Sequence, residues 1–124
     1  SNILITKKIQ ILLFSIFILS SVAYSQTQSP EARALAQTEI MKVELALTPT
    51  QETSVYDVNF GIIIKNDQVK NSTYPEDQKK QIIQQNNESR KLMLKNILTV
   101  DQYSKLELGL EERQEVKKEK QIKN

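Results

Sequence analysis

The chain has 124 residues and a formal net charge of +2, with two glycines and no cysteine, histidine or tryptophan. This length accommodates one small domain, and the missing residue types exclude disulfides, Cys- or His-ligated metal sites, Ser-His or Cys-His catalytic dyads and glycine-rich phosphate loops. We therefore expect a binding or structural protein rather than an enzyme, with no catalytic residues, no bound metal and no cofactor.

Residues 1–25 have the three parts of a secretory signal peptide. Lys7 and Lys8 form a positively charged start, a mostly apolar run follows, and small residues stand three and one positions before Gln26. The apolar run is shorter than the roughly 20 residues of a membrane-spanning helix, so we expect cleavage before Gln26 and no stable membrane span afterwards. The full chain has 17 basic and 15 acidic residues, and removal of the two lysines leaves 15 of each, a neutral mature chain.

The mature chain begins with signals for a helix. Ser29 has the properties of an N-cap, Pro30 suits the first helical position, and Glu31 places an acid in the first turn. Apolar residues then recur every three or four positions, which predicts one face of an amphipathic helix. This face comprises Ala32, Ala36, Ile40, Val43 and Leu47, and it is widened by Met41 and Leu45.

Thr48-Pro49-Thr50-Gln51 predicts the end of this helix and the start of a second one. Proline disfavours the helical conformation in the residue before it but suits the first turn of a new helix. Thr48 and Gln51 have the spacing of a capping box, in which each side chain hydrogen-bonds the other's backbone amide. The second helix then carries Val55, Val58 and Ile62 on one face.

Residues 55–64 also fit a strand, because β-forming residues alternate along them and Gly61 weakens a helix by about 1 kcal/mol. We favour the helix, since nothing else in the chain offers a strand partner and an unpaired edge is an aggregation hazard. In a helix, Tyr56, Phe60 and Ile64 form a second apolar stripe beside Val55. A helix that is apolar over so wide an arc buries both sides or leaves one for a partner. These four residues are therefore candidate contacts for a second copy of the chain, for the chain's own core or for a bound client protein.

The remaining chain predicts a loop and two further helices. Residues 66–75 are polar and rich in turn formers, which indicates the one clear loop, and Thr73 and Glu76 have capping-box spacing. A third helix follows from about Pro75 to Ile97, and its apolar clusters lie eleven residues apart and so share a face. The fourth helix has the stripe Tyr103, Leu106 and Leu110.

One short pattern occurs twice. Leu47-Thr-Pro-Thr-Gln51 recurs as Leu98-Thr-Val-Asp-Gln102, and an apolar residue follows eight positions after each leucine, at Val55 and at Leu106. Each copy has a helix end, a threonine cap and a glutamine at the third helical position. Any helix junction can produce one copy, whereas two copies with the same downstream anchor in a short exported chain are much more specific.

On these residues the mature chain resembles the LTxxQ-motif periplasmic proteins, the Spy/CpxP family. The resemblance implies an all-α fold with about four helices per chain in an antiparallel, cradle-like homodimer in the periplasm of a Gram-negative bacterium. The repeat domain would occupy residues 26–110, followed by residues 111–124 as a charged, frayed helical tail. The resemblance also implies an architectural role for the motif residues, which are Leu47, Thr48, Gln51, Leu98, Thr99 and Gln102.

The function implied by the resemblance is an ATP-independent chaperone-like activity in the stress response, toward unfolded or stressed envelope proteins. The alternatives are a regulatory partner of an envelope-stress sensor kinase and a structural envelope component. Chaperones of the family often present a basic concave face, but this mature chain is neutral and Arg90, Lys91 and Lys95 form only a modest local cluster. The absence of histidine and cysteine disfavours zinc sensing, while export and the neutral charge disfavour nucleic-acid binding.

Overall fold

The computed structural model describes residues 28–123. This part of the chain is all-α, with helices α2 (Pro30–Leu45), α3 (Pro49–Lys70), α4 (Glu76–Ile97) and α5 (Val100–Lys123) and no strand. The helical prediction for residues 55–64 is therefore confirmed. The expected signal peptide lies outside the described residues. Within those residues, no helix has the length and apolar character that crossing a membrane requires.

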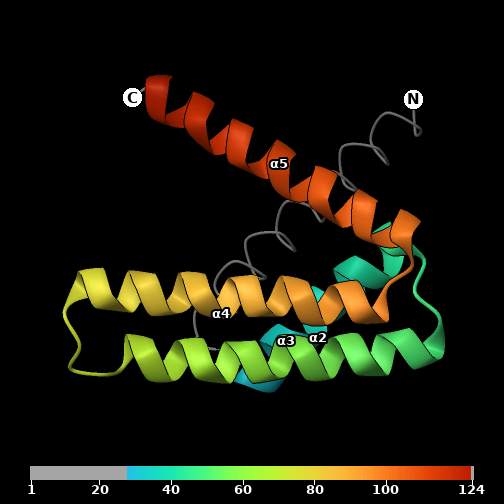
Figure 1. The fold of residues 1–124 in the computed structure, drawn as a ribbon, viewed down its shortest axis with the longest axis horizontal. Coiled ribbons are helices and arrows are strands. Elements are labelled where there is room, and N and C mark those ends of the chain that lie inside the picture. The colour runs from blue at the N-terminus through green and yellow to red at the C-terminus, as the bar shows by residue number, and fades with distance from the viewer. Residues whose placement is uncertain (1–27, 124) are drawn as a thin grey trace, which may run out of the picture.

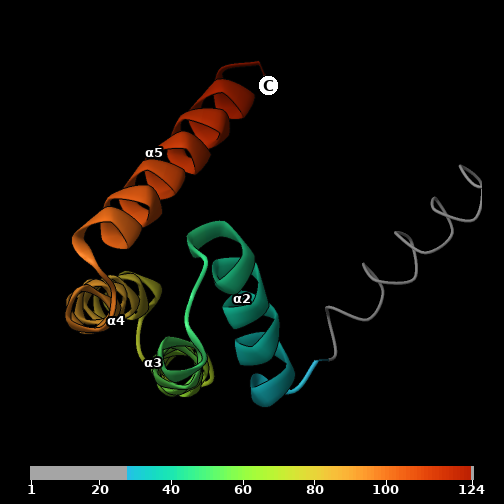
Figure 2. The same ribbon diagram turned by 90° about the vertical axis from the view of Figure 1, so that its right-hand side faces the viewer.

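The four helices form a compact hairpin body and one projecting arm. α3 and α4 lie antiparallel and side by side, α2 packs against α3, and α5 departs from the end of α4 at an angle (Figure 1). Figure 2 shows the resulting wedge, in which the far part of α5 diverges from α2 and from the hairpin. One side of the wedge is therefore α5, and the other is the α2–α3–α4 body.

The ends of α2 and the start of α3 follow the sequence closely. The Ala32 amide donates to Ser29 Oγ (3.2 Å), and α2 ends where Ala46 takes a left-handed conformation with φ 52°. The predicted capping box of α3 is confirmed, because Thr48 Oγ1 accepts from the Gln51 amide (3.2 Å) and Gln51 Oε1 accepts from the Thr48 amide (3.0 Å). These two bonds satisfy amides that a helix start otherwise leaves without partners.

The loop between α3 and α4 is shorter than predicted, and its cap is different. α3 continues through Lys70 because polar residues near its end make tertiary contacts: Asp67 pairs with Arg33 of α2, and Asn66 lies within hydrogen-bond distance of α4 side chains. The predicted capping box of Thr73 is wrong, since Pro75 is the N-cap of α4 and no side chain bonds there.

The predicted apolar face of α2 is confirmed only in part, since Met41, Leu45 and Leu47 are buried. Ile40 and Val43 are 55% and 81% exposed, and the residues that α2 buries are Ala34, Thr38, Met41 and Leu45. The reason is Thr38, whose hydroxyl donates to the Ala34 carbonyl (2.7 Å) and accepts from a buried side chain of α3. A polar residue thus occupies a core position, and the true face is rotated from the one that apolar residues alone indicate.

The apolar core lies where the end of α2, the start of α3, the end of α4 and the start of α5 meet. Six buried residues form it, and partly buried Val58, Ile97, Tyr103 and Leu106 pack against them. These six are Met41, Leu45, Leu47, Val55, Leu94 and Leu98. The leucines that open the two motif copies are both in this cluster, so the repeat brings the four helices together at one end of the hairpin.

Candidate functional site

The two motif glutamines face each other at the junction of the four helices. Gln51 Nε2 donates to Gln102 Oε1 (2.7 Å), and Gln102 Nε2 donates to Gln51 Oε1 (3.0 Å). Each glutamine also completes its own capping box, since Gln102 Oε1 accepts from the Thr99 amide (2.9 Å) and the Thr99 hydroxyl accepts from the Gln102 amide (3.2 Å). The two copies therefore form a reciprocal pair, which we call the glutamine clasp.

Each glutamine of the clasp also binds the helix end that precedes the other motif copy. Gln51 Nε2 donates to the Ile97 carbonyl at the end of α4 (3.3 Å), and Gln102 Nε2 donates to the Leu45 carbonyl at the end of α2 (3.1 Å). Carbonyls in the last turn of a helix lack partners within that helix. The clasp thus supplies hydrogen-bond partners to amides at two helix starts and to carbonyls at two helix ends, and it fixes where α5 leaves the body.

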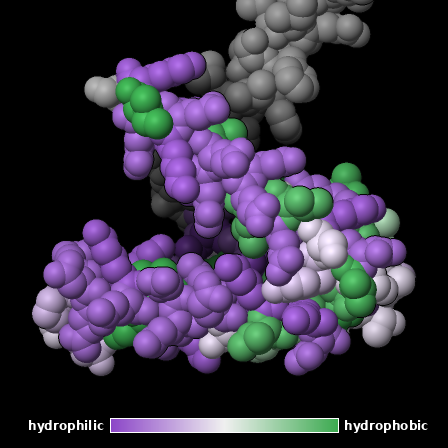
Figure 3. Space-filling view, turned by 45° about the horizontal axis from the view of Figure 1, so that its top comes forward, coloured by the Kyte–Doolittle hydropathy of each residue, from purple (hydrophilic) through white to green (hydrophobic). Residues whose placement is uncertain are grey.

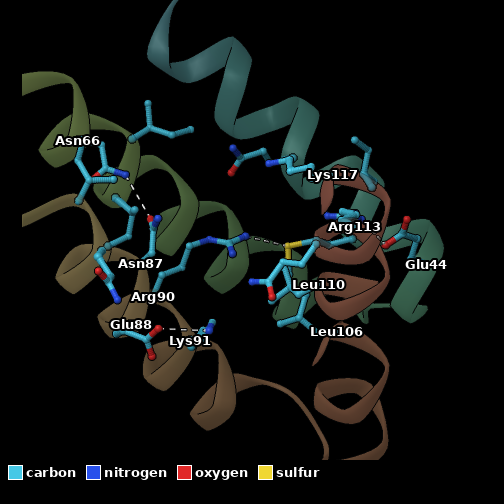
Figure 4. Close-up of a pocket in the computed structure, with 18 of the residues that line it drawn as sticks. Glu44, Asn66, Asn87, Glu88, Arg90, Lys91, Leu106, Leu110, Arg113 and Lys117 are labelled. Carbon is cyan, nitrogen blue, oxygen red and sulfur yellow. Dashed lines mark hydrogen bonds and ion pairs between the residues drawn. The ribbon is translucent and has the colours of Figure 1, made fainter. Parts of the chain in front are cut away.

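A groove of ≈ 840 Å³ lies in the wedge between α5 and the α2–α3–α4 body (Figures 3 and 4). The space-filling view shows a mainly hydrophilic surface around this hollow, with scattered hydrophobic residues (Figure 3). Aliphatic side chains and methionine line part of the groove; they are Ile40, Met41, Ile62, Ile63, Ile83, Leu106 and Leu110. Polar amide side chains line another part; they are Gln37, Asn66, Gln84, Asn87 and Gln114. The groove is therefore amphipathic and open.

The groove concentrates positive charge. Five basic and two acidic residues line it, a surplus of three positive charges; they are Lys80, Arg90, Lys91, Arg113, Lys117, Glu44 and Glu88. Glu88 pairs with Lys91 (3.3 Å), and Glu44 pairs with Arg113 (3.5 Å). Because the described residues carry equal numbers of basic and acidic side chains, the rest of their surface has a matching negative surplus. A neutral chain therefore presents a basic concave face, which total charge did not indicate.

Arg90 reaches from α4 into the groove (Figure 4). Its guanidinium also anchors a buried polar chain. Asn59 Oδ1 accepts from Arg90 Nε (3.0 Å) and Nη2 (2.8 Å), and Asn59 Nδ2 donates to Thr38 Oγ1 (3.1 Å). Asn59 is 0% and Thr38 is 1% exposed. Burial, followed by the positive charge of Arg113, lowers the pKa of Arg90. Sequence reasoning missed this chain, although a lone Asn59 within the apolar run of α3 was the available signal.

The predicted contact residues on α3 lie on a different surface. Val55 is 0% exposed and belongs to the core, so it is not available to a partner. Tyr56 and Phe60 are half-buried and stack, with ring centroids 6.1 Å apart and an interplanar angle of 7°. Ile64 is also half-buried, and none of these three lines the groove. We call Tyr56, Phe60 and Ile64 the α3 stripe.

Residues 111–123 are helical and exposed along their whole length. Lys95 of the sequence-predicted basic cluster lies over the Tyr103 ring, 5.8 Å from its centroid, whereas Arg90 and Lys91 line the groove. Within the described residues, no group of three or more His, Cys, Asp or Glu side chains is placed to hold a metal ion.

No family model, curated protein or solved structure matches this chain. The proposals that follow depend on its own residues and on the repeated motif.

Proposed function

We propose that this protein is an exported, LTxxQ-type chaperone-like protein that holds unfolded or stressed envelope proteins in the periplasm of a Gram-negative bacterium without ATP. The observation that carries the proposal is the open groove, which combines aliphatic surface with uncompensated positive charge. Unfolded proteins expose apolar side chains, and these are the groups that such a groove can remove from water.

The polar lining of the groove fits the same proposal. Amide side chains both donate and accept hydrogen bonds, so they can pair with main-chain N–H and C=O groups of a bound segment whatever its sequence. Five such side chains line the groove. Binding of this kind needs no covalent step and no nucleotide. A groove with these properties suits weak binding of many different clients.

We further propose that the working form is a homodimer with the α3 stripe at its interface. α5 buries no residue in the isolated chain, and the α3 stripe leaves two aromatic rings only half-covered. A domain of this size has a small core and gains stability from association. Sedimentation analysis of the processed protein tests this part: a dimer is expected, and Phe60→Asp should shift it toward monomer. A wild-type monomer would contradict the dimer.

The chaperone proposal is tested by light scattering. A denatured client is diluted into the processed protein at stoichiometric amounts without ATP, and we expect scattering to fall. Lys117→Gln, which removes a groove charge, should weaken protection, especially at low salt. Lys118→Gln is the matched control, because it makes the same change on the adjacent residue, which does not line the groove.

Absence of protection by the wild-type protein at every ratio would refute a holding function. A regulatory role at a sensor kinase would then be the next hypothesis, and a pull-down from membranes would test it.

A further inference from the structure

Arg90 is a cation without a carboxylate partner in the groove. Among residues 28–123 its side chain forms no ion pair, and its hydrogen bonds go to the neutral Asn59 amide and to Met41 Sδ (3.5 Å). Lys80 and Lys117 also lack an ion pair there, whereas Arg113 and Lys91 each have one. The unpaired charges of the groove thus include one that the fold holds in a fixed position.

The geometry leaves one edge of the guanidinium for a ligand. Nε and Nη2 donate to Asn59, so that edge is occupied, and the second Nη2 contact is to a thioether sulfur, a weak acceptor. Nη1 makes no hydrogen bond to the described residues and is not among their buried atoms without partners. Nη1 is therefore the donor left for a carboxylate oxygen, and a second carboxylate oxygen could bind Nη2 only by replacing the weak Met41 contact.

The surroundings strengthen this preference. Buried Asn59 holds the guanidinium in place and is itself bonded to buried Thr38, so little side-chain entropy is lost when a ligand binds. Partial burial removes water from the charge without supplying a counter-ion, and a bound anion would supply one. Ile83, Leu106 and Leu110 line the same groove and offer aliphatic contacts to the neighbours of a carboxylate.

We propose that Arg90 is an anchor for the aspartate or glutamate side chain of a bound polypeptide segment, with apolar residues on either side of that acid seated on the aliphatic lining. This proposal rests on the proposed holding function and specifies its substrate class: acidic, apolar segments bind in preference to basic ones. The groove's positive surplus disfavours basic segments by the same electrostatics.

The test uses the processed protein and a short peptide of leucine, serine, one tryptophan and one glutamate, acetylated and amidated at its ends. Because the protein has no tryptophan, the peptide's fluorescence reports binding directly. The same peptide with glutamine in place of glutamate is the comparison. We expect the glutamate peptide to bind about tenfold more tightly, the scale of one charge-assisted hydrogen-bonded contact.

Variants then locate the preference. Arg90→Gln should abolish the difference between the two peptides, Arg90→Lys should retain part of it, and Lys118→Gln should leave it unchanged. Circular dichroism checks that each variant is folded. Where Arg90→Gln fails to fold, the peptide comparison on the unaltered protein still tests the preference for an acid, and Arg90→Lys tests its assignment to Arg90.

Three outcomes would overturn the anchor. The first is equal binding of the glutamate and glutamine peptides, and the second is an unchanged preference in folded Arg90→Gln. The third is that the glutamine peptide with a free carboxyl terminus binds as tightly as the amidated glutamate peptide, since that result would assign the groove to chain ends. If any of these outcomes occurs while the wild-type protein still suppresses client aggregation, the anchor fails and the holding function stands. If aggregation is not suppressed, the holding function itself fails.

Discussion

The glutamine clasp predicts that Gln51 and Gln102 contribute jointly to stability, which independent surface contacts would not do. Gln102→Ala removes four side-chain hydrogen bonds, two of them to Gln51, one to the Thr99 amide and one to the Leu45 carbonyl. A typical intramolecular hydrogen bond contributes about 1 kcal/mol net, and water can replace part of it at a half-buried site. We therefore expect a loss of about 2 kcal/mol in the free energy of unfolding, and a similar loss for Gln51→Ala.

The double variant separates the clasp from the two capping boxes. The direct bonds between Gln51 and Gln102 are lost in either single variant, so they are counted twice when the single effects are added. The double variant should consequently be less destabilised than that sum by about 1–2 kcal/mol, the net value of the two direct bonds. The caps and the bonds to helix ends belong to one glutamine each and should add.

Urea unfolding followed by far-ultraviolet circular dichroism measures all four members of the cycle. Gln85 of α4 provides the control, because it is exposed and its side chain makes no hydrogen bond within the described residues. The pair Gln51→Ala and Gln85→Ala should be additive. Additivity of Gln51→Ala and Gln102→Ala within about 0.5 kcal/mol would refute the clasp as an interacting unit.

Two further predictions concern the core and pH. Leu94 is 0% exposed, so Leu94→Ala should lower the free energy of unfolding by about 3 kcal/mol, whereas Leu92→Ala, at a 66% exposed position of the same helix, should change it by less than about 0.5 kcal/mol in the same urea titration. The Arg33 hydrogen bond lowers the pKa of Asp67, so this carboxylate adds stability above its unfolded-state pKa that is lost as the pH falls through the folded-state pKa. Asp67→Asn should therefore cost up to about 1 kcal/mol near pH 7 and nothing in strong acid, and a constant cost across this range would contradict the pairing.

Local patterns in the sequence predicted the helices and the position of the motif junctions. Thr48 and Gln51 encode a helix start through side chains that bond backbone amides three residues away, so the chain's own neighbours carry the information. The repeat also predicted that Thr99 and Gln102 would do the same at α5. That the two glutamines bond each other across 51 residues depends on how the helices pack, which no local pattern encodes.

The features that sequence reasoning missed are those in which a polar residue takes an interior position. Thr38 and Asn59 are buried with a hydrogen bond between them, and Asn59 also accepts from Arg90, so a pattern of apolar residues cannot locate their face. The charge of the groove was missed for a related reason. Total charge sums over the whole surface, whereas α4 and α5 bring five basic side chains to the groove.

The central claim is that unfolded protein occupies the groove, and site-specific photo-crosslinking tests it most directly. A photoreactive amino acid is placed at Ile83, which lines the groove, or at Leu92, which lies on the same helix outside it. With a denatured client and no ATP, we predict crosslinking from Ile83 that a competing apolar, acidic peptide reduces, and little from Leu92. Equal crosslinking from both positions, or none from Ile83 while aggregation is still suppressed, would contradict the groove as the binding site.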